Sequence, residues 1–245
     1  GYDHQLWRRI CDEMGWQEMH IPEAYGGLGL GYVELVATLE QMGRYLCCSP
    51  FYASVCLAAN ALLIAGTEHQ KLTYLPQIAE GKTAALAYTG ESGGWDSNSV
   101  KVTYQKQGES YRLNGSYRFV PDGHSAEILV LAARDPDTQG DEGISLFVVP
   151  ANTPGISREW LPTMDQTRRQ GQLRLDNLVL NSDAVMSDVG QAWPQLEKIL
   201  DLGRIAVAAE QLGGSQQCLD STLAYISERV QFGRSIASYQ SIKHK

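Results

Sequence analysis

The stretch YRLNGSYRFV, residues 111–120, decides the class of the fold. It sets an Asn-Gly pair between two runs of strand-favouring residues, which is the strongest short-range signal for a β-hairpin. Further strand-like runs follow at residues 126–135, 143–150 and 171–180, each bounded by Gly, Asp, Asn or Pro. Because no helical pattern lies between these runs, we predict a small β domain with antiparallel pairing rather than a doubly wound parallel sheet.

Helical spacing flanks this β domain on both sides. In VELVATLEQMGRYL, residues 33–46, apolar side chains recur every three or four positions, and the same spacing returns from Trp193 to Val230. The Gly213-Gly214 pair inside the second run costs about 1 kcal/mol per glycine relative to alanine, so we expect a neighbouring helix to pack closely there. We also expect a helix over the last residues, from Val230 to Ile242.

The order of elements is therefore helical, β and helical. We place an N-terminal helical domain at residues 1–83, a middle β domain at 84–188 and the first part of a C-terminal helical domain at 189–245. Within the first of these, IPEAYGGLGLG at residues 21–31 combines a proline with closely spaced glycines, and this composition predicts an irregular turn.

Composition and charge exclude several classes of function. The 245-residue chain has 20 Lys and Arg against 28 Asp and Glu, a net charge of −8, so we expect no nucleic-acid partner. No apolar run is long enough to cross a bilayer, and the first residues mix charge unlike a signal peptide, so we expect a cytoplasmic protein. The five cysteines show no Cys-x-x-Cys spacing and no clustered histidines, so we expect no metal site.

Four separated stretches carry a resemblance to a known family. They are GWQEMHIPEAYGGLGL (15–30), GTEHQKLTYLPQIAEGKTAALAYT (66–89), GESYRLNG (108–115) and LAYISERVQFGRSIASYQ (223–240). In this order and at this spacing they resemble acyl-CoA dehydrogenases, and several motifs in register are more specific than one short pattern. The resemblance implies an α+β fold with an N-terminal helical domain, a middle antiparallel β domain and a C-terminal four-helix bundle, of which this chain carries the start. It also implies FAD held between the last two domains.

The resemblance implies a flavin site at TGESGGWD, residues 89–96, where family members carry Thr-Glu-Pro-x-x-Gly-Ser-Asp. Backbone amides and hydroxyls of this stretch hydrogen-bond the flavin in the family. The implied cofactor residues here are Leu86, Tyr88, Thr89 and Gly94, and Asp96 also matches the pattern. The departures from it are Gly90 for Glu, Glu91 for Pro, and Trp95 for the Ser that meets the flavin phosphate. Since Trp is larger and donates a single N–H, the pyrophosphate must be satisfied differently, shifted or absent.

A second flavin strand resembles the family pattern Lys-x-Trp-Ile-Thr, which reads YRFVP at residues 117–121 here. Phe119 can keep the aromatic wall of the flavin site, whereas Pro121 offers neither a hydroxyl nor a backbone N–H. Two flavin contacts are therefore weakened in this chain. Without the resemblance, Phe119 and Trp95 would be interpreted as ordinary core and rim aromatics of a β domain.

The segment RVQFG, residues 229–233, matches the family's Arg-x-x-Phe-Gly. In the family this arginine reaches the flavin pyrophosphate of a neighbouring subunit, a contact that suits the bidentate geometry of guanidinium. The resemblance therefore implies cofactor contacts from Arg229 and Phe232, and from Gln240 near the adenosine half of the same cofactor. It implies a homo- or heterotetramer. Taken alone, Arg229 would be a solvated charge on a helix.

The family's reaction needs a glutamate that removes the α-proton of an acyl-CoA thioester, and burial can raise the pKa of such a carboxyl toward neutrality. In some members this glutamate follows the pattern Leu-Asp-x-Glu-Arg, which reads LDLGR at residues 200–204 here. Gly203 stands at the base position and cannot act as a base, so the resemblance implies a base from beyond Lys245. Asp201 and Arg204 match positions that contact the CoA substrate, although a plain amphipathic helix would display the same pair.

We therefore expect an FAD-dependent acyl-CoA dehydrogenase subunit, an oxidoreductase of fatty acid or steroid degradation that passes electrons to an electron-transfer flavoprotein or another acceptor. One alternative is a non-catalytic partner subunit of a heteromeric dehydrogenase. The departures at Gly90, Trp95, Pro121 and Gly203 favour that alternative. Another is a flavin oxidase or monooxygenase on the same scaffold, because fold alone does not fix the reaction.

Overall fold

The computed structural model describes residues 2–244. The chain divides into two compact units, and each is described by itself. The first unit contains residues 2–35 and 48–204, and the second contains residues 36–47 and 205–244. None of the helices in residues 2–244 combines the length and the apolar composition that a membrane-spanning helix requires.

The N-terminal part of the first unit is helical, as predicted, with irregular connections. Its elements are α1 (His4–Arg9), the π-helical turn η1 (Ile10–Met14), the 3-10 turns η2 (Trp16–Glu18) and η3 (Glu23–Tyr25), the π-helical segment η4 (Tyr52–Ala59), α3 (Asn60–Ala65) and α4 (Glu68–Ala79). The stretch at 21–31 is a series of turns, which confirms the prediction. Segment η4 is buried throughout because its residues are small or apolar on every side.

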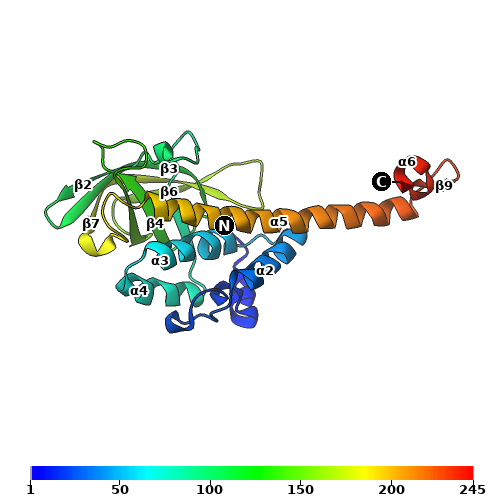
Figure 1. Cartoon of the computed structure of the whole chain (residues 1–245), viewed down its shortest axis with the longest axis horizontal. Coiled ribbons are helices and arrows are strands. Elements are labelled where there is room, and N and C mark those ends of the chain that lie inside the picture. The colour runs from blue at the N-terminus through cyan, green and yellow to red at the C-terminus, as the bar shows by residue number, and fades with distance from the viewer. Residues whose placement is uncertain (1, 245) are drawn as a thin grey trace. The chain divides into compact units, whose positions relative to one another are not determined.

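Segment η4 packs against the first strand of a seven-stranded sheet. The strands are β1 (Ala84–Ala87), β2 (Thr103–Gln107), β3 (Ser110–Pro121), β4 (Ile128–Arg134), β5 (Ile144–Pro150), β6 (Ile156–Leu161) and β7 (Gln170–Asn181). Figure 1 shows the sheet around β3, β4 and β7, and the helices α3 and α4 of the same unit. Ser54 joins the two layers, because its Oγ accepts from the Ala84 amide at 2.9 Å. The 3-10 turns η5 (Ser97–Ser99) and η6 (Ser182–Ala184) lie in the connections.

Most strand pairs are antiparallel, as predicted, but the sheet is mixed. The order is β1-β4-β2-β3-β7-β6, with β5 beside β4. Strand β1 pairs with β4 in parallel, in the register Ala84 to Ile128. Strand β2 also pairs with β4 in parallel, at Thr103 and Arg134, so the antiparallel prediction was wrong for these two pairs. Strands β1, β2 and β4 run in one direction because the loop after β1 brings the chain back before β2, and β3 alone among these four runs in the opposite direction. The sheet encloses an apolar core around Tyr117, Leu113 and Phe147.

The Asn-Gly hairpin prediction was wrong. Asn114 and Gly115 lie inside the continuous strand β3, at a register shift in its pairing with β7. The hairpin turn is instead Gly108-Glu109, between paired residues Gln107 and Ser110. Pairing with β7 decides this outcome: the Asn114 Oδ1 accepts from the Asn177 amide at 2.8 Å, and a Cβ on Gly115 would lie 3.0 Å from the Val102 Cα. Asn114 therefore stands opposite two residues of β7, Asp176 and Asn177, which form a β-bulge in β7.

The second unit is built on parts of two helices, α2 (Tyr32–Arg44) and α5 (Trp193–Glu228). Within this unit the two helices cross closely, because a Cβ on Gly213 would lie 1.8 Å from the Glu40 carbonyl oxygen. A Cβ on Gly43 would likewise lie 2.0 Å from the Glu210 carbonyl oxygen. The close helix neighbour predicted from the glycine pair is confirmed. The Arg44 Nη2 also donates to the Asp220 Oδ2 at 2.6 Å.

The predicted helix over residues 230–242 was wrong. Helix α5 ends at Glu228, and the chain forms a two-stranded ribbon of β8 (Val230–Gln231) and β9 (Arg234–Ser235), followed by η7 (Ile236–Ser238) and α6 (Gln240–Lys243). The turn residues Phe232 and Gly233 have φ of 52° and 84°. Positive φ at both central positions is the requirement of a type I′ hairpin turn, so Gly233 is the residue that permits this change of direction.

Candidate functional site

The loop after β1 is fastened to strand β3 at Thr89. The Thr89 Oγ1 donates to the Arg118 carbonyl oxygen at 2.5 Å, and the Arg118 amide donates to the Thr89 carbonyl oxygen at 3.0 Å. This reciprocal pair joins the two stretches that carry the implied flavin residues. It therefore fixes the Thr89 hydroxyl next to the residue that follows Arg118.

That residue is Phe119, whose backbone is unusual for an aromatic side chain. The pairing of β3 with β7 shifts register between Tyr117 and Val120, and Phe119 has a φ of 61°. Left-handed backbone at a non-glycine residue costs about 1–3 kcal/mol, and such strain concentrates at functional sites. The bulge leaves the ring 38% exposed. Its ring atoms lie 3.2 Å from where a Cβ on Gly93 would stand, so the glycine allows the loop and the ring to meet.

The loop itself is closed by its own contacts. The Gly90 amide donates to the Ser99 carbonyl oxygen at 2.9 Å, and the Ser99 Oγ donates to the Asp96 Oδ1 at 2.8 Å. A Cβ on Gly94 would lie 2.1 Å from the Ser99 Oγ. Gly94 and Asp96, which match the family pattern, therefore build the loop in this structure.

An aromatic pair stands beside this loop. Trp95 is 61% exposed, and its ring meets that of Tyr88 edge to face with centroids 6.3 Å apart. Tyr88 is buried, and this burial raises the pKa of its hydroxyl. Leu86 lies within β1 with its side chain buried in the core, and the half-buried Pro121 pairs with Gln170 at the end of β3. The first unit therefore brings the aromatic residues and Thr89 together.

The position implied for the base is crowded. A Cβ on Gly203 would lie 2.7 Å from the Leu57 Cδ2 and 3.3 Å from the Tyr52 hydroxyl. The guanidinium of Arg168 covers the Tyr52 ring at 4.2 Å from its centroid. The space beside Gly203 is thus occupied by side chains of the N-terminal helical segment.

The two implied substrate residues pair with each other on one helical turn. Arg204 donates to the Asp201 carboxylate, and both side chains are exposed. An exposed pair of this kind contributes little to stability. It is therefore compatible with binding and equally with the solvated face of an amphipathic helix.

The remaining implied cofactor residues lie in the terminal ribbon of the second unit. Arg229 follows the last residue of α5, and Phe232 is 95% exposed at the tip of the turn. Gln240 is the first residue of α6 and is exposed. The Arg229 carbonyl oxygen accepts from the Ile236 amide at 3.0 Å, so the ribbon is held as one piece.

Two buried charged residues of the first unit are not marked by the family motifs. Asp122 follows Pro121, is 6% exposed and has a φ of 52°. Burial raises the pKa of its carboxyl to about 6, and the Arg168 charge partly offsets this increase. The signal that could have indicated a turn there is Pro-Asp-Gly at residues 121–123. The second is Arg134, which no motif marks.

The residues present fit one end of FAD better than the other. The exposed rings of Phe119 and Trp95 suit contact with a flat aromatic ring system, and the buried Thr89 hydroxyl is fixed beside Phe119 by its bond to the Arg118 carbonyl oxygen. At the implied phosphate position, Trp95 supplies no hydroxyl. Pro121 likewise supplies no N–H at the second strand. The residues therefore fit the ring end of FAD, but they do not supply the phosphate contact that the family's Ser makes.

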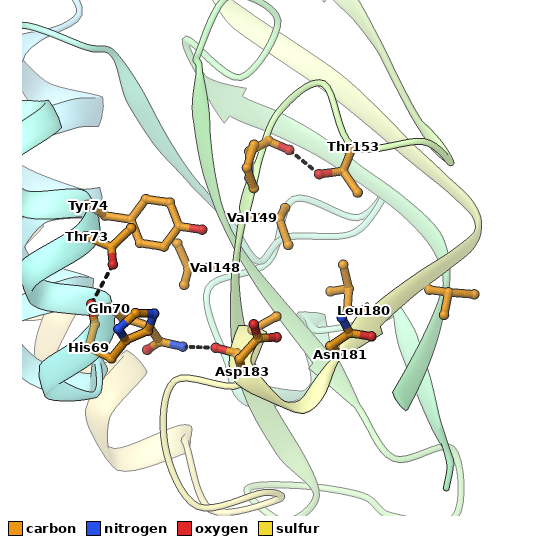
Figure 2. Close-up of a pocket in the computed structure, with 13 residues that line it drawn as sticks. His69, Gln70, Thr73, Tyr74, Val148, Val149, Thr153, Leu180, Asn181 and Asp183 are labelled. Atoms are coloured by element: carbon orange, nitrogen blue, oxygen red, sulfur yellow. Dashed lines mark hydrogen bonds between the residues drawn. The ribbon is translucent and has the colours of Figure 1, made fainter. Parts of the chain in front are cut away.

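A separate cavity of about 280 Å³ lies between α4 and the ends of β5 and β7 (Figure 2). The Gln70 Nε2 donates to the carbonyl oxygens of Asp183 and Val185 at 2.7 and 2.9 Å, and the Thr73 Oγ1 donates to the His69 carbonyl oxygen at 2.7 Å. The Gln70 side chain thus joins α4 to the chain after β7, whereas the Thr73 hydrogen bond lies within α4. The residues that line this cavity differ from those implied for flavin or substrate, and we interpret it as a structural seam.

Comparison with known proteins agrees with this architecture. Family models of the acyl-CoA dehydrogenase N-terminal, middle and C-terminal domains match residues 1–82, 85–178 and 190–245. An acyl-CoA dehydrogenase of Bacillus subtilis (strain 168) is 32% identical over 92% of this chain and 61% of its own length. The chain therefore spans about three fifths of that relative.

Solved structures give the same result. Butyryl-CoA dehydrogenase from Megasphaera elsdenii has a TM-score of 0.93 at 28% identity, covering 99% of this chain and 66% of its own. A steroid acyl-CoA dehydrogenase, Tcur3481-Tcur3483 with a G363A substitution, has a TM-score of 0.83 at 33% identity, covering 99% of this chain and 63% of its own. With its three family domains matched in order, this chain belongs to the acyl-CoA dehydrogenase family.

Proposed function

We propose that this chain is part of an FAD-dependent acyl-CoA dehydrogenase subunit that converts an acyl-CoA thioester to the 2-enoyl-CoA. The observation that carries the proposal is the reciprocal pair of hydrogen bonds between Thr89 and Arg118, which fixes the Thr89 hydroxyl beside the strained Phe119. Strain of this kind persists only where the surrounding structure enforces it. We further propose the domain boundaries 83/84 and 188/189 for the three family domains.

In this proposal the side chains around the loop bind and orient the ring system. Phe119 covers one face and excludes water, and the Thr89 hydroxyl presents a hydrogen-bonding group at its edge. The Tyr88 hydroxyl is protonated at neutral pH, as tyrosine ordinarily is, and burial raises its pKa further, so it adds no charge beside the ring. When bound, FAD supplies the acceptor for the hydride that leaves the β-carbon.

The proton acceptor for the α-carbon comes from elsewhere in the protein than residues 2–244. Gly203 has no side chain, and Leu57 and Tyr52 occupy the space into which one would extend. We propose that Asp201 and Arg204 contact the CoA portion of the substrate. We also propose that Arg229, Phe232 and Gln240 contact the cofactor of a neighbouring subunit in a homo- or heterotetramer, with an electron-transfer flavoprotein as acceptor.

The full-length protein tests this proposal. Purified protein should show flavin absorbance near 450 nm that bleaches anaerobically on addition of an acyl-CoA, as expected for roughly one bound flavin per site. Phe119→Ala should weaken flavin binding, whereas Phe119→Trp should retain it. A protein that contains no flavin and gains none on incubation with FAD would contradict the proposal.

A second candidate is a non-catalytic partner subunit in a heteromeric dehydrogenase. Trp95 at the implied phosphate position and Pro121 on the second strand favour it, and the similarity to a steroid acyl-CoA dehydrogenase described under two protein designations supports it. Co-expression with a neighbouring dehydrogenase gene should then raise solubility and flavin content. If Trp95→Ser gives the isolated subunit full flavin occupancy, Trp95 is the cause of weak binding. If flavin content is the same with and without the partner, this second candidate fails.

A further inference from the structure

Arg134, the last residue of β4, is a buried charge. Its side chain is 8% exposed, and burial lowers its pKa, an effect that the nearby Asp141 charge partly offsets. A buried charge is tolerated only when its hydrogen-bonding groups find partners. The guanidinium donates to four main-chain carbonyl oxygens: Val100 at 3.4 Å, Ser97 at 2.5 Å, Gly140 at 2.8 Å and Glu142 at 2.7 Å.

These four acceptors belong to two loops. Two lie at residues 97–100, which close the loop that begins at Thr89. The other two lie at residues 140–142, in the connection from β4 to β5. One side chain thus clamps two segments that are more than 35 residues apart in the sequence.

The backbone of Arg134 gives this clamp a rigid base. Its amide donates to the Val102 carbonyl oxygen at 2.8 Å, and the Asp135 amide donates to the Gly143 carbonyl oxygen at 2.9 Å. Both hydrogen bonds continue the sheet at the end of β4. The guanidinium therefore acts from a fixed point against the two loops.

Residues 97–100 contact the loop that carries the implied flavin residues, and so help to fix its position. The Gly90 amide donates to the Ser99 carbonyl oxygen at 2.9 Å, directly beside Thr89. The Ser99 Oγ is the atom that a Cβ on Gly94 would meet at 2.1 Å. A displacement of Ser99 would therefore move both sides of the loop.

We propose that Arg134 is a positioning residue of the flavin site, holding residues 97–100 so that Thr89 and Gly94 keep the places from which they meet the ring system. This inference rests on the proposed function. Arginine suits the task because its planar guanidinium offers five N–H donors in a fixed plane. Lysine offers three donors around a single nitrogen and glutamine two, so neither can reach all four carbonyl oxygens in this arrangement.

Hydrogen exchange of the full-length protein tests the mechanical part without any flavin. We expect Arg134→Gln to speed amide exchange in residues 90–100 and 140–143 by at least about tenfold, with strands β4 and β5 unchanged, because the loops lose their clamp while the sheet keeps its pairing. Arg134→Lys should give a smaller increase. The matched control is Arg112→Gln in β3, where the buried Arg112 Nε has no hydrogen-bond partner among the described residues. It should leave exchange in the loop unchanged.

Unchanged exchange in residues 90–100 of Arg134→Gln would overturn the inference. An equal increase across β4 and β5 would also overturn it, because that result describes a merely structural residue.

Flavin binding supplies the functional part. We expect Arg134→Gln to raise the dissociation constant of FAD by about tenfold and to shift the shape of the flavin absorbance band, with partial recovery in Arg134→Lys and no change in Arg112→Gln. Faster loop exchange with unaltered FAD affinity and spectrum would overturn the positioning role. If the wild-type protein binds no FAD, the proposed function and this role at the flavin fail together, while the exchange measurement still decides whether Arg134 holds the loop.

Discussion

Alanine should change the free energy of unfolding in opposite directions at the two adjacent glycines of α5, Gly213 and Gly214. A Cβ on Gly213 would lie 1.8 Å from the Glu40 carbonyl oxygen, whereas ordinary contact begins at 3.4 Å, so the helices must separate by about 3.4 − 1.8 = 1.6 Å. The obstruction is main chain and cannot rotate away. A Cβ on Gly214 would lie 3.6 Å from the Gly43 carbonyl oxygen, which is ordinary contact.

The magnitudes follow from two opposing effects. Replacing glycine by alanine within a helix stabilises by about 1 kcal/mol, and overpacking against a rigid neighbour costs about 1–3 kcal/mol or more. For Gly213→Ala the clash is severe, so we expect a net loss of about 2 kcal/mol in the free energy of unfolding. For Gly214→Ala only the helix preference remains, so we expect a gain of up to about 1 kcal/mol.

Urea unfolding of the purified protein, followed by far-ultraviolet circular dichroism, measures both effects against wild type. The two variants differ by one position and share every feature of composition. We expect the midpoint of Gly213→Ala to fall and that of Gly214→Ala to rise or stay level. Equal midpoints, or a stabilised Gly213→Ala, would show that the two helices do not cross as closely as the structure has them.

Three further perturbations test buried groups. Burial raises the pKa of the Asp122 carboxyl to about 6, so the stability that this group contributes below pH 4 is lost as pH rises through 6. Asp122→Asn should therefore stabilise the protein at pH 7.5 by at most about 3 kcal/mol, as measured by urea midpoints from pH 4 to 8. If the variant's midpoints vary with pH as steeply as those of the wild type, this assignment is contradicted. Burial lowers the pKa of His20, so its unfolded form takes up a proton first and stability should fall as pH drops below about 6.5. His20→Gln should lessen that fall, the exposed His69→Gln should not, and an unaltered profile in His20→Gln would refute the assignment. Gly203→Ala should destabilise the protein by about 1 kcal/mol in thermal unfolding, because the new Cβ would lie 2.7 Å from the Leu57 Cδ2. In a Leu57→Ala background the same substitution should carry no such cost. If the destabilisation by the two substitutions is additive, this contact is excluded.

Local pattern was sufficient wherever one residue type repeats along an element. The apolar spacing of residues 33–46 predicted a helix, observed at Tyr32–Arg44, and the strand-like run at 143–150 predicted β5 at Ile144–Pro150. The position of turns was different. Both Asn114-Gly115 and Gly108-Glu109 permit a turn, and the choice depends on pairing with β7, some 60 residues later. Single-sequence propensity contains no information on that partner.

The candidate site divides in the same way. Thr89, Gly94 and Phe119 could be named because the family pattern marks them, and the structure gathers them around one loop. Their roles toward a flavin stay predictions. Arg134 and Asp122 could not be named, because each depends on burial and on main-chain groups that the fold brings to it. Main-chain acceptors leave no residue signature in the sequence.

Main-chain hydrogen bonds also hold the loop in which this chain departs from the family pattern at positions 90, 91 and 95. The loop is held by the Gly90 amide on Ser99, the Gly93 amide on Gly90, and the reciprocal contacts of Thr89 with Arg118, in which main-chain atoms are the acceptors. A side-chain change at position 91 or 95 removes none of these hydrogen bonds, so these two substitutions alter what the loop presents to a cofactor. Position 90 is different, because a Cβ on Gly90 would lie 2.9 Å from the Lys101 Cγ and 3.3 Å from the Ser99 carbonyl oxygen. Trp95→Ser restores a hydroxyl at the implied phosphate position and also removes the ring that meets Tyr88 edge to face, so the flavin affinity of that variant measures both changes together.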